Sequence, residues 1–407
     1  MSVSRVGVVG AGTMGRGIAQ IAALGNYETV LYDPLPGVAT ESVEALRWAL
    51  DKGAARGRWS EEDATAAAQR VQPADDVAQL GECELAIEAA PERLELKREI
   101  FSQLAETLGP QATLASNTSS LRVGEIAAGV PEPERVVGMH FFNPPPLMKL
   151  VEIVAAERSS EAALAAATEV GERMGRTPIR AKDSPGFVAN RLARPFSLES
   201  LRILGDGVAD AATIDRIVRL GGGFRMGPFE LLDLIGLDVN LEIARSFFAQ
   251  GGEVERWRPS PIQERLVAEG KLGRKSGHGY YEYDEGYKRE SDPDLGIDAP
   301  TLDASQLAKI HPAAGQVLPR LFAQIANEAA FALEEQIASP EDMDTAMRLG
   351  FNWPVGPLDF AELIGPHRAV ELLERLEESS GPAYTQAPLL RRAAAEGVAL
   401  QDLEGRR

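Results

Sequence analysis

One segment near the amino terminus constrains the fold of this chain more than any other feature: VGVVGAGTMGRGIAQ. Residues 5–9 predict a short buried strand, and residues 14–24 carry apolar side chains at helical spacing. Between them, Gly10, Gly12 and Gly15 match the pattern G-x-G-x-x-G, which gives a tight turn, lets a phosphate approach the backbone, and lets the helix pack closely on the strand. These elements together predict the first strand and helix of a doubly wound α/β sheet.

A second strand is predicted at residues 27–32, and Asp33 follows it directly. A carboxylate about 20 residues after such a glycine turn accepts hydrogen bonds from the ribose hydroxyls of a dinucleotide and repels a 2′-phosphate, so it favours NAD over NADP. The glycine pattern alone also occurs in plain strand-to-helix connections, and Asp33 before Pro34 is alternatively a turn former. The two features taken together predict a Rossmann-type domain with NAD as its cofactor.

The composition is that of a globular protein and disfavours several classes of partner. The 407 residues are 44% hydrophobic and 25% charged, which suits two or three domains with apolar cores. A formal net charge of −19 argues against nucleic-acid and anionic-membrane partners. One cysteine and four histidines exclude a disulfide framework and a zinc-type cluster, so no bound metal is expected. Neither a signal-peptide pattern nor a run of about 20 apolar residues is found, which predicts a cytoplasmic protein.

Apolar strands alternate with helical stretches from residue 5 to about residue 182. This alternation is typical of a doubly wound parallel sheet. After the first two strands, further strands are predicted at residues 85–87, 113–115, 136–139 and 149–154. At the segment DSPG, residues 183–186, the strands end and the spacing of apolar residues becomes helical, so a domain boundary is expected there.

The helical half of the chain contains an internal repeat. Residues 214–236 (IDRIVRLGGGFRMGPFELLDLIG) align without gaps on residues 343–365 (MDTAMRLGFNWPVGPLDFAELIG), an offset of 129 residues (343 minus 214). The polar, tyrosine-rich residues 273–294 between the two copies are interpreted as a linker. The predicted domains are an α/β Rossmann-type domain at residues 1–183, followed by two all-α helical domains related by internal duplication at residues 184–290 and 291–407.

Three segments follow predicted strands, where ligands of open α/β sheets bind. They are SNTSSL at residues 116–121, HFFNPPPLMKLVE at residues 140–152 and DSPGFVANR at residues 183–191. His140 is a candidate general base, because imidazole takes and returns a proton near neutral pH. A histidine after an apolar strand is more often structural, but Glu152 on the following strand is suited to hold its tautomer and to stabilise the imidazolium.

These segments, together with MGPFELLDLIGLD at residues 226–238 and GRKSGHGYYEY at residues 273–283, resemble the 3-hydroxyacyl-CoA dehydrogenase family over nearly the whole chain. The resemblance is to the short-chain 3-hydroxybutyryl-CoA dehydrogenase kind. It implies reversible, NAD-dependent oxidation of an L-3-hydroxyacyl-CoA to the 3-ketoacyl-CoA. His140 and Glu152 then serve as the catalytic pair, and Ser119 and Asn190 as donors to the substrate oxygen. The implied cofactor contacts are Gly10, Gly12, Thr13, Met14, Gly15, Asp33, Glu92, Lys97 and Asn117.

Several assignments have alternatives. Members of the family usually place a serine and a lysine against the CoA in the helical hairpin after the second strand, where this chain has Ala49 and Arg56. Arginine keeps the positive charge, whereas alanine lacks the hydroxyl. Glu92 and Lys97 are alternatively a charge pair on a helix. Ser119 is alternatively a helix cap and Asn190 a solvated side chain.

The substrate and the catalytic competence also stay open. Hydroxybutyryl-CoA, a longer acyl-CoA, and the dicarboxylic hydroxyadipyl-CoA of aromatic degradation are alternative substrates. A relative that acts on a hydroxy acid without CoA would keep the same sheet and histidine. A non-catalytic NAD-binding relative is the third possibility, and the presence of Ser119, His140, Glu152 and Asn190 argues against it.

The second helical copy is expected to be structural. Asn190 corresponds to Pro319 (190 plus 129), and neither a second glycine turn nor a second His–Glu pair is found. Apolar residues at helical spacing predict a buried face in this copy: Leu321, Phe322, Ile325, Ala326, Ala329 and Leu333. In single-copy relatives the helical domain is the expected dimer surface, so a fused copy predicts a pseudo-dimeric pair within one chain and hence a monomer. A homodimer through other surfaces is the alternative.

Overall fold

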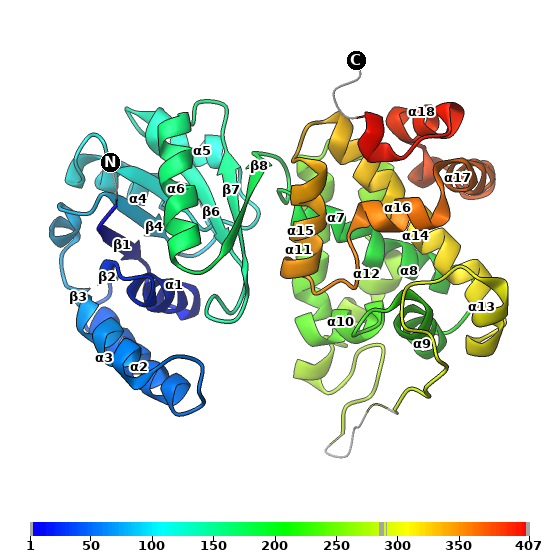
Figure 1. The fold of residues 1–407 in the computed structure, drawn as a ribbon, viewed down its shortest axis with the longest axis horizontal. Coiled ribbons are helices and arrows are strands. Elements are labelled where there is room, and N and C mark those ends of the chain that lie inside the picture. The colour runs from blue at the N-terminus through cyan, green and yellow to red at the C-terminus, as the bar shows by residue number, and fades with distance from the viewer. Residues whose placement is uncertain (1–2, 285–288, 290, 404–407) are drawn as a thin grey trace. The chain divides into compact units, whose positions relative to one another are not determined.

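The computed structural model describes residues 3–284, 289 and 291–403. The chain divides into two compact units, Met1–Phe187 and Val188–Arg407. The first unit contains the sheet and the second is helical (Figure 1). In the part of the chain that is described, no helix is long and apolar enough to cross a membrane.

The first unit is an eight-stranded sheet with helices packed against it, as the Rossmann-type prediction requires. Its strands are β1 (Arg5–Val9), β2 (Glu28–Tyr32), β3 (Val71–Ala74), β4 (Leu85–Glu88), β5 (Thr113–Ser116), β6 (Val136–Phe141), β7 (Leu150–Ala155) and β8 (Thr177–Lys182), in the spatial order β3-β2-β1-β4-β5-β6-β7-β8. Its helices are α1 (Thr13–Leu24), α2 (Val38–Ala54), α3 (Glu61–Arg70), α4 (Leu94–Thr107), α5 (Val123–Ala127) and α6 (Glu161–Arg173). Helix α6 lies across one face of the sheet (Figure 1).

The prediction of a wholly parallel sheet is wrong at one place, because β6 and β7 pair antiparallel. Only residues 142–149 connect these two strands, and a parallel crossover needs about a dozen residues or more. The prediction also omitted the two edge strands, β3 and β8. Each contains a proline, Pro73 and Pro178, which weakens a strand pattern but is tolerated at a sheet edge.

The second unit confirms the internal repeat. Its helices are α7 (Ala189–Leu192), α8 (Arg194–Gly205), α9 (Ala211–Gly222), α10 (Pro228–Ile235), α11 (Leu237–Gln250), α12 (Pro261–Ala268), α13 (Ala304–Ile310), α14 (Ala314–Glu334), α15 (Pro340–Gly350), α16 (Pro357–Ile364), α17 (Pro366–Ser380) and α18 (Pro388–Glu396). Helices α15, α16 and α17 begin 129 residues after α9, α10 and α11 (340 minus 211, 357 minus 228, 366 minus 237). The two copies are therefore built from equivalent helices.

The tyrosine-rich stretch between the copies packs on the first copy over its described part, so the linker interpretation is wrong there. The Tyr281 hydroxyl donates to Asp215 at 2.7 Å, and the Tyr283 hydroxyl donates to Asp233 at 2.9 Å. Asp215 also accepts from the backbone of Phe229 at 2.9 Å, which caps the start of α10. The predicted boundary between the copies, at residue 290, lies outside the described residues.

Helix α14 packs on α8 and α9, so the two copies lie together in one unit. Of the six apolar residues predicted to form a buried face, all are buried except Leu333, which is half-buried. Two sets of ion pairs also cross between the copies: Arg191 with Glu328 at 2.8 Å and Glu335 at 2.6 Å, and Arg320 with Glu199 at 2.8 Å and Asp206 at 2.7 Å. Each member of the first set has its counterpart in the second at the same offset of 129 (320 minus 191, 328 minus 199, 335 minus 206), which is the reciprocal pattern of a two-fold interface.

Candidate active site

The three glycines of the first turn differ in why a side chain would or would not fit at their positions. Gly10 adopts φ of +97°, and a Cβ atom there would lie 2.8 Å from the carbonyl oxygen of Ala89. A Cβ atom on Gly15 would lie 1.7 Å from the carbonyl oxygen of Gly10. A Cβ atom on Gly12 would meet no protein atom within 4 Å, so the fold itself leaves this space open. Gly12 precedes α1 without a side-chain cap, so the free N–H groups of the first turn suit a pyrophosphate.

Asp33 lies beside this turn at the end of β2. Its Oδ2 atom accepts from the Ala11 backbone N–H at 2.9 Å, and its Oδ1 atom accepts from the Leu35 N–H at 3.1 Å. The bond to Leu35 is the one expected if Asp33 is a turn former before Pro34. The first holds the carboxylate against the glycine turn, where the ribose of a dinucleotide lies in such domains.

Glu88 is a buried carboxylate that was not predicted, and it connects the ends of β4 and β5. Glu88, at the end of β4, is fully buried, accepts from the Ser116 hydroxyl at 2.7 Å and pairs with Lys97 at 2.6 Å. Lys97 is 1% exposed and also lies 3.3 Å from Glu92. Glu92 precedes α4, so this pair is not the helical charge pair considered as an alternative. Lys97 instead pairs with two carboxylates of the segment at and after the end of β4.

Glu92 holds the loop after β5. Its Oε1 atom accepts from the Thr118 hydroxyl at 2.7 Å and from the Ser119 and Ser120 backbone N–H groups, each at 2.9 Å. Burial acts to raise the pKa of Glu92, but Lys97 and these hydrogen bonds outweigh it and hold the pKa below its ordinary value. The carboxylate is therefore ionised at neutral pH. The backbone of Ser119 is fixed while its side chain stays exposed.

His140 and Glu152 face each other on the antiparallel strands β6 and β7. The His140 Nδ1 atom lies 2.5 Å from the Glu152 Oε2 atom, and the two residues are 6% and 0% exposed. A proton on Nδ1 directed at the carboxylate leaves Nε2 as the acceptor for a substrate proton. The rings of Phe142 and Phe187 lie 4.6 and 5.8 Å from the imidazole, and Asn117 accepts from the Phe141 N–H at 2.9 Å.

The structure brings Ala49 and Arg56 together in a cavity of about 260 Å³ between α2, the α2–α3 turn and the loop after β6. Lys52 and Arg58 line the same cavity, so three cations gather there. The Trp48 side chain is 62% exposed, and Lys52 Nζ lies 4.3 Å from its ring centroid. Trp48, Lys52 and Arg58 were not predicted as site residues, because the turn between α2 and α3 brings them together.

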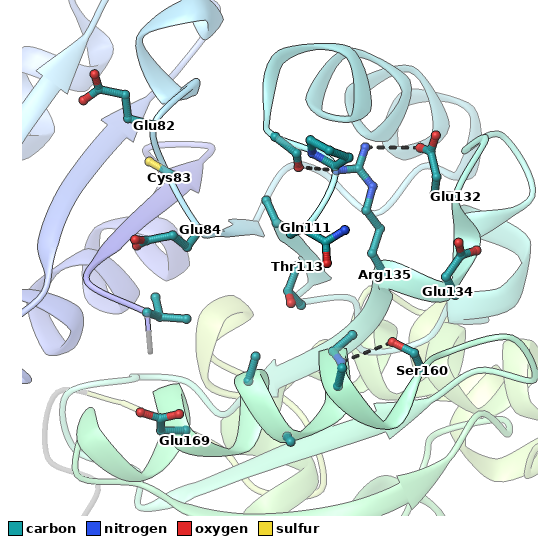
Figure 2. Close-up of a pocket in the computed structure, with 18 of the residues that line it drawn as sticks. Glu82, Cys83, Glu84, Gln111, Thr113, Glu132, Glu134, Arg135, Ser160 and Glu169 are labelled. Carbon is teal, nitrogen blue, oxygen red and sulfur yellow. Dashed lines mark hydrogen bonds and ion pairs between the residues drawn. The ribbon is translucent and has the colours of Figure 1, made fainter. Parts of the chain in front are cut away.

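A larger cavity, of about 630 Å³, lies at the other end of the strands (Figure 2). Residues just before β4, β5 and β6 line it, whereas His140 and Asp33 lie at the carboxyl ends of strands. Its carboxylates are Glu82, Glu84, Glu132, Glu134 and Glu169. None of the predicted site residues lines it, and its charge does not suit an anionic nucleotide.

Asn190 lies in the second unit, on α7, whereas Ser119, His140 and Glu152 lie in the first. The Asn190 side chain is half-buried, and its backbone carbonyl accepts from Arg194 Nε at 3.3 Å. Helix α7 thus presents Asn190 one turn before α8 begins.

Residues 5–184 match the NAD binding domain of the 3-hydroxyacyl-CoA dehydrogenase family, and residues 186–283 and 315–403 match the C-terminal domain of that family. The 3-hydroxyadipyl-CoA dehydrogenase of Escherichia coli K12 is 35% identical over 97% of this chain and 98% of its own length. A probable 3-hydroxybutyryl-CoA dehydrogenase of Deinococcus radiodurans is 37% identical over 69% of this chain and 100% of its own length. The crystal structure of a 3-hydroxybutyryl-CoA dehydrogenase from Escherichia coli K12 has a TM-score of 0.86 at 35% identity, covering 97% of this chain and 99% of that chain.

Proposed function

This chain belongs to the 3-hydroxyacyl-CoA dehydrogenase family, and we propose that it oxidises L-3-hydroxyacyl-CoA thioesters reversibly to 3-ketoacyl-CoA with NAD as cofactor. The buried His140–Glu152 pair, 2.5 Å apart, is the observation that carries this proposal. Measuring NADH formation with CoA thioesters and with free 3-hydroxy acids tests it. Turnover of the free acids alone would favour a relative that does not use CoA. Cofactor binding without any turnover would favour a non-catalytic relative.

In the proposed reaction, His140 Nε2 takes the proton of the substrate hydroxyl, while the hydride leaves the carbon atom that bears this hydroxyl. Bound NAD would supply the hydride acceptor. Glu152 stabilises the imidazolium as it forms, and its burial strengthens this interaction. Ser119 and Asn190 donate hydrogen bonds to the substrate oxygen as its charge changes. In the reverse direction His140 returns the proton.

The residues around the glycine turn would hold the cofactor. The open space at Gly12 and the backbone N–H groups of Thr13 and Met14 would receive the pyrophosphate. Asp33 would accept from the ribose. Asn117, Glu92 and Lys97 would shape the nicotinamide side, the last two through the loop that Glu92 organises.

Asp33→Ser is expected to lower kcat/KM for NAD and to raise the relative use of NADP. The variant loses the ribose hydrogen bonds and the repulsion of the 2′-phosphate, and a hydrogen bond to a charged group contributes about 10- to 100-fold. Steady-state kcat/KM with each cofactor measures the change. Asp298→Ser, which removes an exposed charge in the second unit, is the control. An unchanged NAD/NADP ratio in Asp33→Ser would leave Asp33 only a turn residue.

The cavity that contains Arg56, Lys52 and Arg58 is suited to the nucleotide part of CoA, whose phosphates are anionic and whose adenine stacks on aromatic rings such as Trp48. Arg56→Ala is expected to raise KM for an acyl-CoA about tenfold with kcat unchanged, because this contact binds substrate and transition state equally. The matching acyl-pantetheine thioester lacks the nucleotide and serves as the control substrate. An equal rise in KM for both substrates would contradict this role.

We also propose that the two helical copies pair within the chain and that the protein is a monomer. The reciprocal ion pairs of Arg191 and Arg320 support this, since they have the pattern expected of a two-fold interface and are made inside one polypeptide. Light scattering coupled to size exclusion is expected to give the mass of one chain, 43.7 kDa. Twice that mass would instead indicate a homodimer through another surface.

A further inference from the structure

Arg194, the first residue of α8, is a buried cation for which the described residues provide no counter-ion. It is 5% exposed, its Nε atom donates only to the Asn190 carbonyl at 3.3 Å, and its Nη1 atom is buried without a hydrogen-bond partner. Among the residues that the structure describes, no carboxylate forms an ion pair with it. The ring centroid of Phe247 lies 5.4 Å from its Cζ atom. Burial lowers the pKa of Arg194 to about 10, so the guanidinium remains charged at neutral pH.

Other arginines of the same unit whose side chains are at most 9% exposed are paired. Arg191, Arg219 and Arg320 each form ion pairs with two carboxylates at 2.9 Å or less. Leaving a buried charge unpaired is costly, so its presence calls for a reason other than stability. Packing of the helix does not require it, because the equivalent position in the second copy is the fully buried Ala323 (194 plus 129).

Arg194 lines a small pocket together with Ser197, Asn240 and apolar residues of α10. Phe351 and Trp353 of the second copy complete its wall. The free space is about 20 Å³, which accommodates one water molecule or one carboxylate oxygen but no alkyl chain. The pocket thus suits a small anionic group that approaches from outside.

We propose that Arg194 binds a carboxylate at the far end of the acyl chain, so that the substrates are CoA thioesters of 3-hydroxy dicarboxylic acids. This inference rests on the proposed function, in which Asn190 meets the oxygen on the third carbon of the acyl group. Arg194 follows Asn190 by four residues, a rise of about 6 Å along a helix. A carboxylate carbon three C–C bonds beyond the third carbon lies about 4 Å away, and its oxygens reach further. With a hydrogen bond of about 3 Å to the carboxylate added, a six-carbon diacid covers this rise, whereas a four-carbon hydroxybutyryl group, which ends one bond beyond the third carbon, does not.

The test compares two substrates of equal length, 3-hydroxyadipyl-CoA and 3-hydroxyhexanoyl-CoA, which end in a carboxylate and in a methyl group. The full-length enzyme is expected to prefer the diacid in kcat/KM. Arg194→Met is expected to lower kcat/KM for the diacid about 10- to 100-fold and to leave the neutral substrate nearly unchanged. Arg194→Lys keeps the charge and should retain part of the preference. The inhibition constants of adipyl-CoA and hexanoyl-CoA give the same comparison without turnover.

Arg245→Met is the matched control. Arg245 is an exposed arginine on α11 that pairs with Glu242 and Glu264, so its loss is expected to leave the preference unchanged. An equal loss on both substrates in Arg194→Met and Arg194→Lys, with a lower thermal midpoint, would overturn the proposal in favour of a structural role. An enzyme that turns over the neutral substrate without preferring the diacid would overturn it as well. Absence of turnover with every acyl-CoA would instead refute the proposed function.

Discussion

His140→Ala is expected to lower kcat for 3-hydroxyacyl-CoA oxidation by 10²- to 10⁴-fold, the usual contribution of general acid–base catalysis. NADH affinity is expected to stay close to that of the wild type, because His140 lies at the end of β6, away from the glycine turn that would hold the pyrophosphate. Steady-state kinetics and NADH fluorescence titration measure the two quantities. A wild-type kcat in His140→Ala would make the catalytic assignment wrong.

Glu152→Gln tests how much the support of the His140 ring by Glu152 contributes, because His140 itself, the proposed base, is kept. The variant keeps the shape of the side chain but removes the charge that faces Nδ1 at 2.5 Å, so both the tautomer and the imidazolium lose their support. We expect kcat to fall with little change in KM. Glu157→Gln is the control, since Glu157 is an exposed acid shortly after β7. Equal effects of the two substitutions would indicate a general loss of charge rather than a partner for His140.

Arg320→Met is expected to lower the free energy of unfolding by about 3–5 kcal/mol, because it breaks a buried ion pair and leaves the other charge behind. Arg320 contacts Glu199 at 2.8 Å and Asp206 at 2.7 Å, and its Nη2 atom donates to the Tyr384 hydroxyl at 2.7 Å. Burial already raises the pKa of Glu199 against the opposing effect of its arginine neighbours. Urea unfolding at an unchanged m-value measures the loss.

The exposed ion pairs of Arg245 offer a control for this stability measurement, since Arg245→Met is expected to leave the unfolding midpoint unchanged. Arg191→Met should behave like Arg320→Met if the two arginines are equivalent. A midpoint in Arg320→Met that matches the Arg245 variant would mean that the ion pairs between the copies do not hold them together.

Local patterns in the sequence were sufficient to predict the glycine turn, the first two strands and the internal repeat. For the turn and the strands the signal lies in hydrophobic periodicity and glycine spacing among neighbouring residues, and for the repeat it lies in the alignment of residues 214–236 with residues 343–365. The pairing of His140 with Glu152 was also expected, although the sheet was taken to be parallel throughout. The antiparallel pairing of β6 and β7 follows from the length of their connection, residues 142–149, which is too short for a parallel crossover.

The rest depended on contacts between distant residues. Glu88 meets Ser116 because the neighbouring parallel strands β4 and β5 end at the same edge of the sheet, and it meets Lys97 because α4 follows β4 and packs beside it. Tyr281 and Tyr283 lie in a polar stretch that was interpreted as a linker, but their hydroxyl groups donate to the buried carboxylates of Asp215 and Asp233. Polar residues without periodicity give no local sign of such partners, so their burial was not foreseeable from composition.

The duplication has a consequence for how this protein can change. In a symmetric dimer every substitution is made in both halves at once, so a residue that benefits one half must be tolerated by the other. Fusion removes that coupling, and the two halves of this chain have diverged where the first copy holds Asn190 and Arg194 and the second holds Pro319 and Ala323. Under the proposed function, the first copy can therefore change at its substrate-binding positions without the same change in the second copy.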